Sequence, residues 1–587
     1  MTLEHFVVPE PLLQVCYDLC REYPEHTMRI ARYLLDLNLR CKTRGVDRTL
    51  CIDLPKQGKI YDKGLSTGTI CRTNDGMYNG TEYRKNSGIT PILELTFRRV
   101  GERWVLRHPT DPTLVFYSRT LLYSSKKLKR KAPDEVQREG ERSFFDLDSK
   151  VTEVSLPSKD LRDLRAIAAR IIPLSIPTWN DLDFRHGPGA VSDVSIKRKD
   201  KFSFPTWTHK LNRWFPYKEF SGHRYGYSGI LKGLTNYGKV CSVPKTLDKV
   251  RVITVEPASN QFFQQGLRGF LVGNLTAIAS QSIDTSSQEA SKTAACKASV
   301  DGLSATVDLK SASDYLSLDL FEICFDVNPV LRDMLLACRT DKVRSPEGSL
   351  HTLRKYAGQG NATTFIVQSL IYTILCILAI LRDENLKATR NNIRRAGKKV
   401  RVFGDDILLP SANLLTFSRI LCDCGLKVNT DKTHHNGFFR EACGGDYFRG
   451  YDVTPFYLKA FRPEKDPEGL VSWLSVANNA YAKGLLQTSA WMRDHGPHNI
   501  PVNSPSGFGY VSRLPYRFSP FRARWNRELH RLEFWELLPI SRPTLRPSEL
   551  TYGRLYKYFV EKPNHFVKWE GDLTIGTTVE IKRRWVA

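Results

Sequence analysis

Two acidic residues lie side by side between two short, mostly apolar runs. Asp405 and Asp406 follow Gly404, with the runs 400–403 and 407–409 on either side. Apolar runs joined by glycine and aspartate are typical of a β-hairpin. Adjacent carboxylates raise each other's pKa unless a cation offsets their charge, and a divalent metal ion would do so. A plain surface turn is the alternative, because Gly and Asp are common turn residues.

A second acidic position makes phosphate chemistry the favoured interpretation. The segment 305–307 predicts a strand that ends at Asp308, and the start of a helix follows. Mg²⁺ prefers oxygen ligands, and two such ions shared by Asp308 and Asp405 would activate an attacking hydroxyl and neutralise a leaving phosphate. The two positions therefore indicate phosphoryl transfer. Asp314 has a simpler interpretation, because Ser311 and Asp314 have the spacing of a helix capping box.

A basic strand is predicted upstream of both acidic positions. Residues 249–253 alternate so that Lys249, Arg251 and Ile253 share one face. Together with Lys245, these cations could hold a triphosphate, the arginine through paired hydrogen bonds and the lysines as point charges. A strand face exposed to solvent is the alternative.

The charge of the chain indicates a polyanionic partner. Its 587 residues carry 87 basic and 62 acidic side chains, a net charge of +25. So many excess positive charges repel one another unless the protein binds a polyanion, and nucleic acid is the first candidate. Residues 197–239 interleave cations with aromatic rings, as RNA backbone contact plus base stacking would require, or as an aromatic core with a basic rim would produce. The length exceeds that of a single core, so we expect several subdomains.

Secreted and membrane proteins fit the sequence less well. Residues 1–20 have no signal-peptide pattern. The 13 cysteines are an odd number spread along the chain, which favours a reducing compartment. The uncharged stretch 356–381 is long enough to span a membrane, but its first half is polar, which favours a buried helix.

A zinc site is a further alternative. Softer metal ligands gather near residue 430: Cys422, Cys424, His434 and His435. Zn²⁺ prefers such ligands, but a one-residue gap between the cysteines and adjacent histidines fit no common zinc finger. We therefore favour the carboxylates as metal ligands. Complete phosphate-loop, metalloprotease and EF-hand signatures are absent from the sequence.

In their order along the chain, these segments resemble the polymerase motifs in the replicases of single-stranded RNA bacteriophages, the leviviruses. The similarity covers residues 241–460. The matching segments are 243–245 with 251–257 for motif F, 305–314 for motif A, 360–371 for motif B, 403–407 for motif C and 429–433 for motif D. Residues 439–457 are the most distinctive, because other polymerase families do not share them.

The resemblance implies a role for each site residue. Asp308 and Asp405 would bind two Mg²⁺ ions, for which Mn²⁺ could substitute, with Asp406 assisting. The nucleoside triphosphate would be held by Lys245, Arg251, Gly360 and Asn361. Asp314 would sense the ribose 2′-hydroxyl, the group that separates RNA from DNA precursors. Lys432 would donate a proton to the departing pyrophosphate.

The resemblance also implies an α+β fold and a function. The fold would be a right-hand polymerase, with an N-terminal region and fingers at 1–300 that include motif F at 241–257, a palm of antiparallel strands backed by helices at 301–460, and a thumb at 461–587. The function would be RNA-directed RNA polymerase, which copies a single-stranded RNA genome by two-metal nucleotidyl transfer. The protein would act in the cytoplasm of an infected bacterium, with no membrane as a partner.

The partners implied by the resemblance are template and product RNA, nucleoside triphosphates, the host translation elongation factors Tu and Ts and other host RNA-binding proteins. A reverse transcriptase and a non-enzymatic RNA-packaging protein are the alternative functions.

Overall fold

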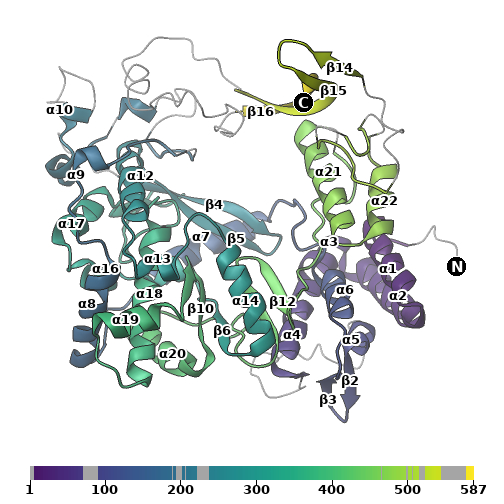
Figure 1. Ribbon diagram of the computed structural model, residues 1–587, viewed down its shortest axis with the longest axis horizontal. Coiled ribbons are helices and arrows are strands. Elements are labelled where there is room, and N and C mark those ends of the chain that lie inside the picture. The colour runs from purple at the N-terminus through teal and green to yellow at the C-terminus, as the bar shows by residue number, and fades with distance from the viewer. Residues whose placement is uncertain are drawn as a thin grey trace.

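The chain folds into a mixture of helices and small sheets (Figure 1). The computed structural model describes residues 6–586, apart from the segments 71–89, 188, 194–200, 205, 221–236, 465, 498–499, 505–506, 514–521 and 544–576. The described chain contains both helices and sheets, so the mixed helix-and-sheet fold expected from the sequence is confirmed.

The described part of the first 150 residues is mostly helical. Their elements are α1 (Glu10–Glu22), η2 (Pro24–His26), α2 (Thr27–Arg44), α3 (Val46–Arg48), η3 (Thr49–Asp53), α4 (Leu54–Thr67), β1 (Thr69–Ile70), α5 (Thr90–Thr96), β2 (Phe97–Val100), β3 (Arg103–Leu106), α6 (Pro112–Tyr123) and α7 (Asp134–Ser149). Pro24 separates α1 from α2, because proline has no N–H to continue the helical hydrogen bonds.

The next segment carries the basic strand. Its elements are α8 (Ser158–Ile171), η4 (Trp179–Asp181), η5 (Lys201–Ser203), α9 (His209–Trp214), α10 (Tyr217–Phe220), β4 (Gly238–Thr246), β5 (Lys249–Val255), α12 (Ala258–Gly273), α13 (Ala279–Ser282) and α14 (Glu289–Asp301). The aromatic residues described between 202 and 217 are largely buried, and Trp207 and Phe215 pack on Phe263 of α12. The described part of this aromatic stretch is therefore core, while residues 194–200 and 221–236 lie outside the description.

The third segment builds the central sheet. Its elements are β6 (Ser304–Val307), α15 (Ala312–Tyr315), α16 (Leu318–Phe325), α17 (Pro329–Cys338), β7 (Lys342–Arg344), β8 (Leu350–Thr352), α18 (Thr364–Asp383), α19 (Arg390–Gly397), β9 (Arg401–Phe403), β10 (Asp406–Pro410), η6 (Ser411–Asn413), α20 (Leu414–Asp423), β11 (Phe439–Ala442), β12 (Gly445–Phe448) and β13 (Tyr451–Asp452). The order in the central sheet is β6-β10-β9, with antiparallel neighbours. The basic strands form a second sheet in the order β5-β4-β7-β8.

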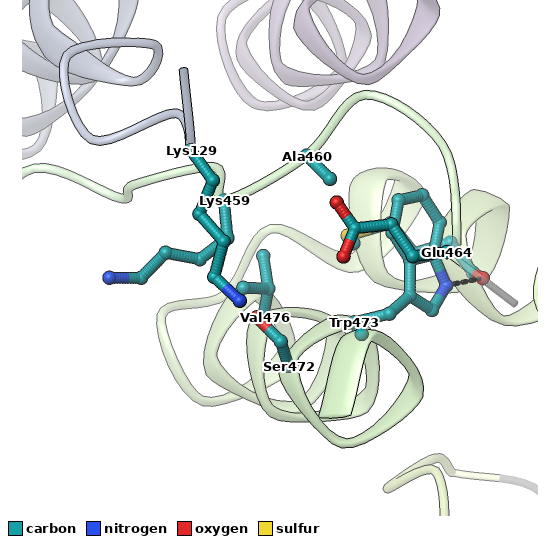
Figure 2. Close-up of a pocket in the computed structure, with 9 residues that line it drawn as sticks. Lys129, Lys459, Ala460, Glu464, Ser472, Trp473 and Val476 are labelled. Carbon is teal, nitrogen blue, oxygen red and sulfur yellow. Dashed lines mark hydrogen bonds between the residues drawn. The ribbon is translucent and has the colours of Figure 1, made fainter. Parts of the chain in front are cut away.

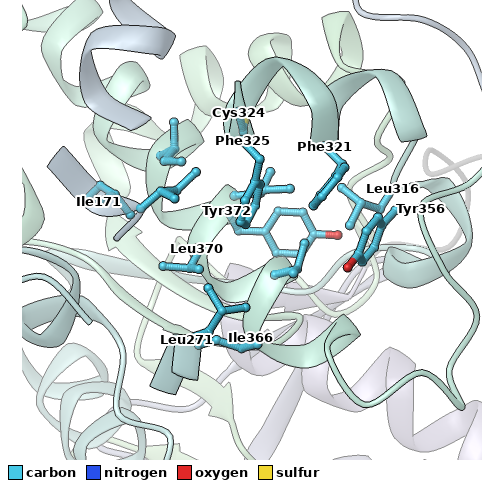
Figure 3. Close-up of a cluster of buried hydrophobic side chains, with 14 of the residues drawn as sticks. Ile171, Leu271, Leu316, Phe321, Cys324, Phe325, Tyr356, Ile366, Leu370 and Tyr372 are labelled. Atoms are coloured by element: carbon cyan, nitrogen blue, oxygen red, sulfur yellow. The ribbon is translucent and has the colours of Figure 1, made fainter. Parts of the chain in front are cut away.

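Helix α18 is the central helix of the larger hydrophobic core. It is long and apolar enough to cross a membrane, since an 18-residue stretch of it has a mean hydropathy of 2.3. However, 94% of that stretch is buried inside the protein. Figure 3 shows Ile366, Leu370 and Tyr372 of α18 among aromatic and aliphatic side chains from surrounding segments. The buried helix expected here is confirmed, and it begins at Thr364, so it also includes the last few residues of the polar first half.

The chain ends with two helices and a three-stranded sheet. These elements are α21 (Pro467–Ala482), α22 (Leu486–Asp494), β14 (Ala523–Asn526), β15 (Arg531–Pro543) and β16 (Thr577–Val586). A second hydrophobic core joins helices α1 to α6 with β11, β12, α21 and α22. Figure 1 shows the N-terminal helices beside α21 and α22, so the two ends of the sequence form one packed unit.

Candidate active site

The pairing of β6 with β10 brings the predicted carboxylates to one end of the central sheet. Ile407 pairs with Val307, so Asp406, which begins β10, lies beside Asp308, which follows β6. Asp405 occupies the turn between β9 and β10. The predicted hairpin and the predicted strand before Asp308 are both confirmed.

The turn of this hairpin requires glycine. Gly404 has a φ of 64°, a conformation that residues with a side chain rarely adopt. A Cβ at this position would also come within 2.9 Å of the Phe365 ring. The Gly404 N–H donates to Ser369 Oγ at 3.0 Å, so α18 fixes the turn that carries Asp405.

The segment after α20 holds Asp308 from the other side of β6. Thr306 and His434 exchange backbone hydrogen bonds of 2.9 Å, so this segment lies along the free edge of β6. Asn429 Nδ2 donates to Asp308 Oδ2 at 2.6 Å, and Lys432 Nζ lies 3.8 Å from the same oxygen. Asn429 and Lys432 therefore restrict the orientation of the Asp308 carboxylate.

Burial and mutual repulsion make these carboxylates suited to a cation. Burial raises the pKa of Asp308, and Lys432 and Asn429 offset only part of this effect. Burial, with the charges of Asp405 and Asp308, raises the pKa of Asp406 to about 6. A bound divalent cation would offset the unfavourable energy of holding these buried carboxylates in their charged form. Oxygen is the donor that Mg²⁺ prefers.

The three carboxylates would supply only part of a metal coordination shell. Among the described residues, no three His, Cys, Asp or Glu side chains form a group that could hold a metal ion by themselves. Mg²⁺ is commonly bound through one or two carboxylates, with water and substrate phosphates as the remaining ligands. The donor set of Asp308, Asp405 and Asp406 fits that mode of binding.

Lys432 is a charged lysine beside these acids. Burial lowers the pKa of its ammonium, but Glu441 and the aspartates Asp308, Asp406 and Asp405 outweigh burial, so the net pKa is raised. Lys432 therefore holds its proton firmly next to the carboxylates.

The predicted cation Lys245 on β4 lies near the same site. Strands β4 and β5 pair antiparallel, with a register shift between Pro244 and Thr246 that leaves Lys245 in a bulge. Burial lowers the pKa of Lys245, and the nearby Arg251 and Lys432 lower it further, whereas Asp308 and Asp405 act in the opposite direction. Lys245 is therefore within electrostatic reach of both the other cations and the carboxylates.

The opposite face of β5 is covered by α7. A Cβ at Gly140 of α7 would lie 2.3 Å from a methyl of Val250 and 3.7 Å from one of Val252. Lys249 and Arg251, which alternate with these valines, are exposed. The predicted strand, with Lys249 and Arg251 on one face, is confirmed.

Gly360 and Asn361 lie in a tight loop against β5. A Cβ at Gly360 would lie 1.5 Å from the Thr254 carbonyl oxygen, and one at Gly358 would lie 2.1 Å from Thr254 Oγ1. Asn361 Oδ1 accepts hydrogen bonds from the N–H and the hydroxyl of Thr363, at 2.8 and 2.7 Å. The glycines therefore allow the loop before α18 to contact the basic strand directly.

The capping interpretation of Asp314 is wrong. Ser311 precedes α15 but makes no side-chain capping hydrogen bond, and its φ of 48° lies in the left-handed region. The Asp314 carboxylate instead accepts a hydrogen bond of 2.8 Å from Lys355 Nζ. Local spacing could not reveal this partner, which lies 41 residues away.

The N-terminal region contributes cations that the sequence did not reveal. Burial lowers the pKa of Lys59 on α4, and the charges of Lys249 and Lys126 lower it further. Lys63, also on α4, donates from Nζ to the Thr430 carbonyl at 3.1 Å. Helix α4 therefore extends the basic rim of the site.

The zinc alternative finds no support. Cys424 is buried in the larger core, whereas Cys422, two residues away, is exposed. His434 is buried with its ring against Phe439, at 4.8 Å between centroids. These side chains form no metal-binding group within the described residues.

A separate small pocket lies next to α21. Figure 2 shows Lys129, Lys459 and Glu464 around it, with Trp473 Nε1 donating to the Met492 carbonyl at 2.9 Å. Its lining includes none of the predicted site residues.

Comparison with known proteins identifies related chains for the central part of the sequence. Residues 222–479 match the family model described as "RNA replicase, beta-chain". The RNA-directed RNA polymerase subunit beta of Escherichia virus Qbeta is 36% identical over 231 residues, covering 39% of this chain and 36% of that protein. The corresponding protein of Enterobacteria phage SP is 34% identical over 327 residues, covering 55% of this chain and 50% of that protein.

A third relative gives the same result. The RNA-directed RNA polymerase beta chain of Escherichia phage MS2 is 34% identical over 251 residues, covering 42% of this chain and 41% of that protein. The matched segments thus span half or less of the length of these three relatives.

The crystal structure of the RNA-dependent RNA polymerase of a human picorbirnavirus aligns with a TM-score of 0.45 at 13% identity, covering 62% of this chain and 76% of that chain. The sequence comparisons confirm the resemblance predicted from the motifs: residues 222–479 of this chain match the family model of RNA replicase beta-chains, and the three relatives to which the chain is similar are RNA-directed RNA polymerase chains of bacteriophages.

Proposed function

We propose that this chain is an RNA-directed RNA polymerase that replicates the single-stranded RNA genome of a bacteriophage. The observation that carries the proposal is the antiparallel pairing of β6 with β10, which brings Asp406 beside Asp308. Lys245 lies close enough for the charges of Asp308 and Asp405 to affect its pKa. Homology to phage replicase beta-chains over residues 222–479 supports the same function.

The proposed architecture is a right-hand polymerase. Residues 1–300 would form the N-terminal region and fingers, 301–460 the palm and 461–587 the thumb with the C-terminal region. The antiparallel sheet β6-β10-β9, with α18 packed next to it, supports the palm assignment.

The carboxylates would hold the catalytic metal. Asp308, Asp405 and Asp406 would bind two Mg²⁺ ions, or Mn²⁺ in their place. When bound, these ions would supply Lewis-acid activation of a hydroxyl and neutralisation of the departing pyrophosphate. Positioning and charge neutralisation account for most of the rate enhancement expected at such a site.

The remaining site residues would bind the nucleotide and move one proton. Lys245 and Arg251 would hold the triphosphate, with Gly360 and Asn361 next to it. Asp314 would accept a hydrogen bond from the ribose 2′-hydroxyl. Lys432, whose net pKa is raised, would keep its proton on Nζ until it donates that proton to the pyrophosphate oxygen.

The proposed partners follow from the activity. They are template and product RNA and nucleoside triphosphates, with host elongation factors Tu and Ts and other host RNA-binding proteins as further partners, in the cytoplasm of the infected bacterium. The net charge of +25 supports the RNA partner.

Asp405→Asn tests the proposal. The purified chain, with and without host extract, is supplied with several RNAs and with ribo- or deoxyribonucleotides. We expect RNA synthesis from ribonucleotides that Asp405→Asn and magnesium chelation both abolish, while RNA binding is kept or slightly tightened because a negative charge has been removed.

A matched control and two contrary outcomes complete the test. Asp36→Asn changes an exposed aspartate of α2 and should leave synthesis unchanged. Synthesis unaffected by Asp405→Asn would contradict the site assignment and favour a packaging protein. Preferential use of deoxyribonucleotides would instead establish a reverse transcriptase.

A further inference from the structure

Lys355 is a buried lysine whose ammonium group has one carboxylate partner. Its side chain is fully buried, and Nζ donates to Asp314 Oδ1 at 2.8 Å. The same nitrogen lies 3.5 Å from the centroid of the Phe144 ring. A buried ammonium is stable only when it is paired, and the face of an aromatic ring adds a further attraction. Asp314 and Phe144 therefore account for the placement of this charge.

The backbone around Lys355 is held from two sides. Its N–H donates to Asp148 Oδ1 of α7 at 3.2 Å, and its carbonyl accepts from Arg339 Nη2 at 2.9 Å. Lys355 also forms an antiparallel bridge with Ser317, three residues after Asp314. These contacts fix the backbone from which the Lys355 side chain reaches Asp314.

The second oxygen of Asp314 remains available. Lys355 binds Oδ1, whereas Oδ2 accepts no hydrogen bond from any residue that the structure describes, and 15% of the side chain is exposed. A carboxylate oxygen that reaches solvent in this way can accept a hydrogen bond from a ligand.

Asp314 and the predicted metal ligand Asp405 both lie near Tyr372 of α18. Burial raises the pKa of Tyr372 on α18, and the charges of Asp405 and Asp314 raise it further. Tyr372 Oη donates to the Ala312 carbonyl at 3.0 Å, which ties α18 to the short helix that carries Asp314. The charges of Asp314 and Asp405 therefore both influence the Tyr372 hydroxyl.

We infer that Lys355 is a positioning residue that orients Asp314 so that its free oxygen Oδ2 accepts a hydrogen bond from a ribose hydroxyl. Lys355 thereby sets the preference for ribonucleotides over deoxyribonucleotides. This inference rests on the proposed function, because it assigns a sugar to the site. A site built to hydrogen-bond a hydroxyl rejects an analogue that lacks it far more strongly than an apolar pocket rejects an added group.

A purely structural role for Lys355 predicts a different result. If the ion pair only stabilised the fold, its loss would reduce the use of both sugars in equal proportion. If Lys355 orients Asp314, its loss reduces the use of ribonucleotides alone. The ratio of the two kcat/KM values separates these roles.

The test uses the full chain with Lys355→Met, which keeps the length of the side chain and removes its charge. We expect the ratio of kcat/KM for ATP to that for 2′-deoxy-ATP to fall by roughly tenfold or more, through a higher KM for ATP. Lys355→Arg, which keeps the charge, should recover part of the ratio. Lys399→Met, which removes the partner of Glu384 in a surface ion pair, should leave the ratio unchanged.

Equilibrium binding provides a second measurement that does not depend on synthesis. Calorimetric titration with ATP and with 2′-deoxy-ATP in Mg²⁺ should show a ribose preference in the wild type that Lys355→Met loses. Where Lys355→Met does not fold, Lys355→Gln takes its place. An unchanged ratio, or an equal loss for both nucleotides, overturns the inference. A wild-type chain that synthesises no RNA overturns the proposed function, and the titrations still decide the role of Lys355.

Discussion

Arg119 of α6 and Asp446 of β12 form a buried ion pair across 327 residues of sequence. Arg119 Nη1 lies 2.8 Å from Asp446 Oδ2, and Nε of the same guanidinium lies 2.7 Å from Asp62 Oδ1 of α4. All three side chains are at least nine-tenths buried. One arginine therefore joins two N-terminal helices to the hairpin β11–β12, next to the candidate active site.

Arg119→Met should lower the free energy of unfolding by roughly 3–5 kcal/mol, because it leaves two carboxylates buried without their cation. The urea midpoint of the full chain measures this change. Arg130→Met is the matched control, since Arg130 and Asp47 form an ion pair of 3.2 Å with side chains 39% and 45% exposed. An exposed pair contributes less than about 1 kcal/mol, so equal effects of the two substitutions would contradict the prediction.

The stability of the chain should depend on pH through Glu441. Burial raises the pKa of Glu441 from 4.5 to about 7, and the Asp446 carboxylate acts in the same direction. Between these two values the folded state holds a proton that the unfolded chain has lost, so stability falls as the pH rises. Glu441→Gln cannot ionise, and it should therefore gain stability relative to the wild type as the pH rises through this window.

Urea midpoints of both proteins across this pH range provide the measurement for Glu441. Glu25→Gln, at an exposed glutamate, is the control and should parallel the wild type. Parallel curves for Glu441→Gln and the wild type would show that Glu441 titrates near its ordinary pKa.

Gly360→Ala should disrupt the contact between the loop before α18 and β5. The added Cβ would overlap the Thr254 carbonyl oxygen, so one of the two segments must move. Overpacking of this kind costs typically about 1–3 kcal/mol, and here it also displaces the predicted nucleotide site. We expect a lower thermal midpoint and a loss of synthesis.

Gly269→Ala serves as the control for Gly360→Ala. Gly269 lies in α12, and a Cβ there would meet nothing within 4 Å. Alanine should be neutral or slightly stabilising at that position, because it is the better helix former. A Gly360→Ala protein with wild-type stability and activity would show that the loop adjusts freely.

Lys245→Ala and Arg251→Ala should each raise the nucleotide concentration needed for synthesis. A hydrogen bond to a charged group contributes about 1.5–3 kcal/mol, so the KM for nucleotide should rise by roughly tenfold or more. Steady-state kinetics at varied nucleotide measures this, with Lys159→Ala on the exposed surface of α8 as the control. An unchanged KM would remove these two cations from the proposed nucleotide site.

Local patterns were sufficient to predict the elements that carry the site. The hairpin at 400–409 and the strand before Asp308 both follow from short apolar runs next to acids and glycine, a signal contained within ten residues. The basic face of β5 likewise follows from alternation. These predictions hold because strand and turn preferences depend on neighbouring residues.

The parts that could not be predicted depend on partners far apart in the sequence. Asp314 has cap-like spacing, and only the fold shows that Lys355 takes its carboxylate. Polar residues made the first half of 356–381 look unlike a core helix, yet Ser369 is fully buried, donating to the Phe365 carbonyl and accepting from Gly404. The cations of α4 next to the site gave no local signal at all.

The shared core of the two chain ends has a consequence for synthesis of the protein on the ribosome. Described core residues between 8 and 128 pack against described core residues between 439 and 537, so the first helices cannot complete their core until more than 300 further residues have been made. At about 5–20 residues per second, this interval lasts on the order of tens of seconds. During that time the nascent N-terminal segment exposes apolar surface, which makes it the natural substrate for chaperones of the cell that translates it.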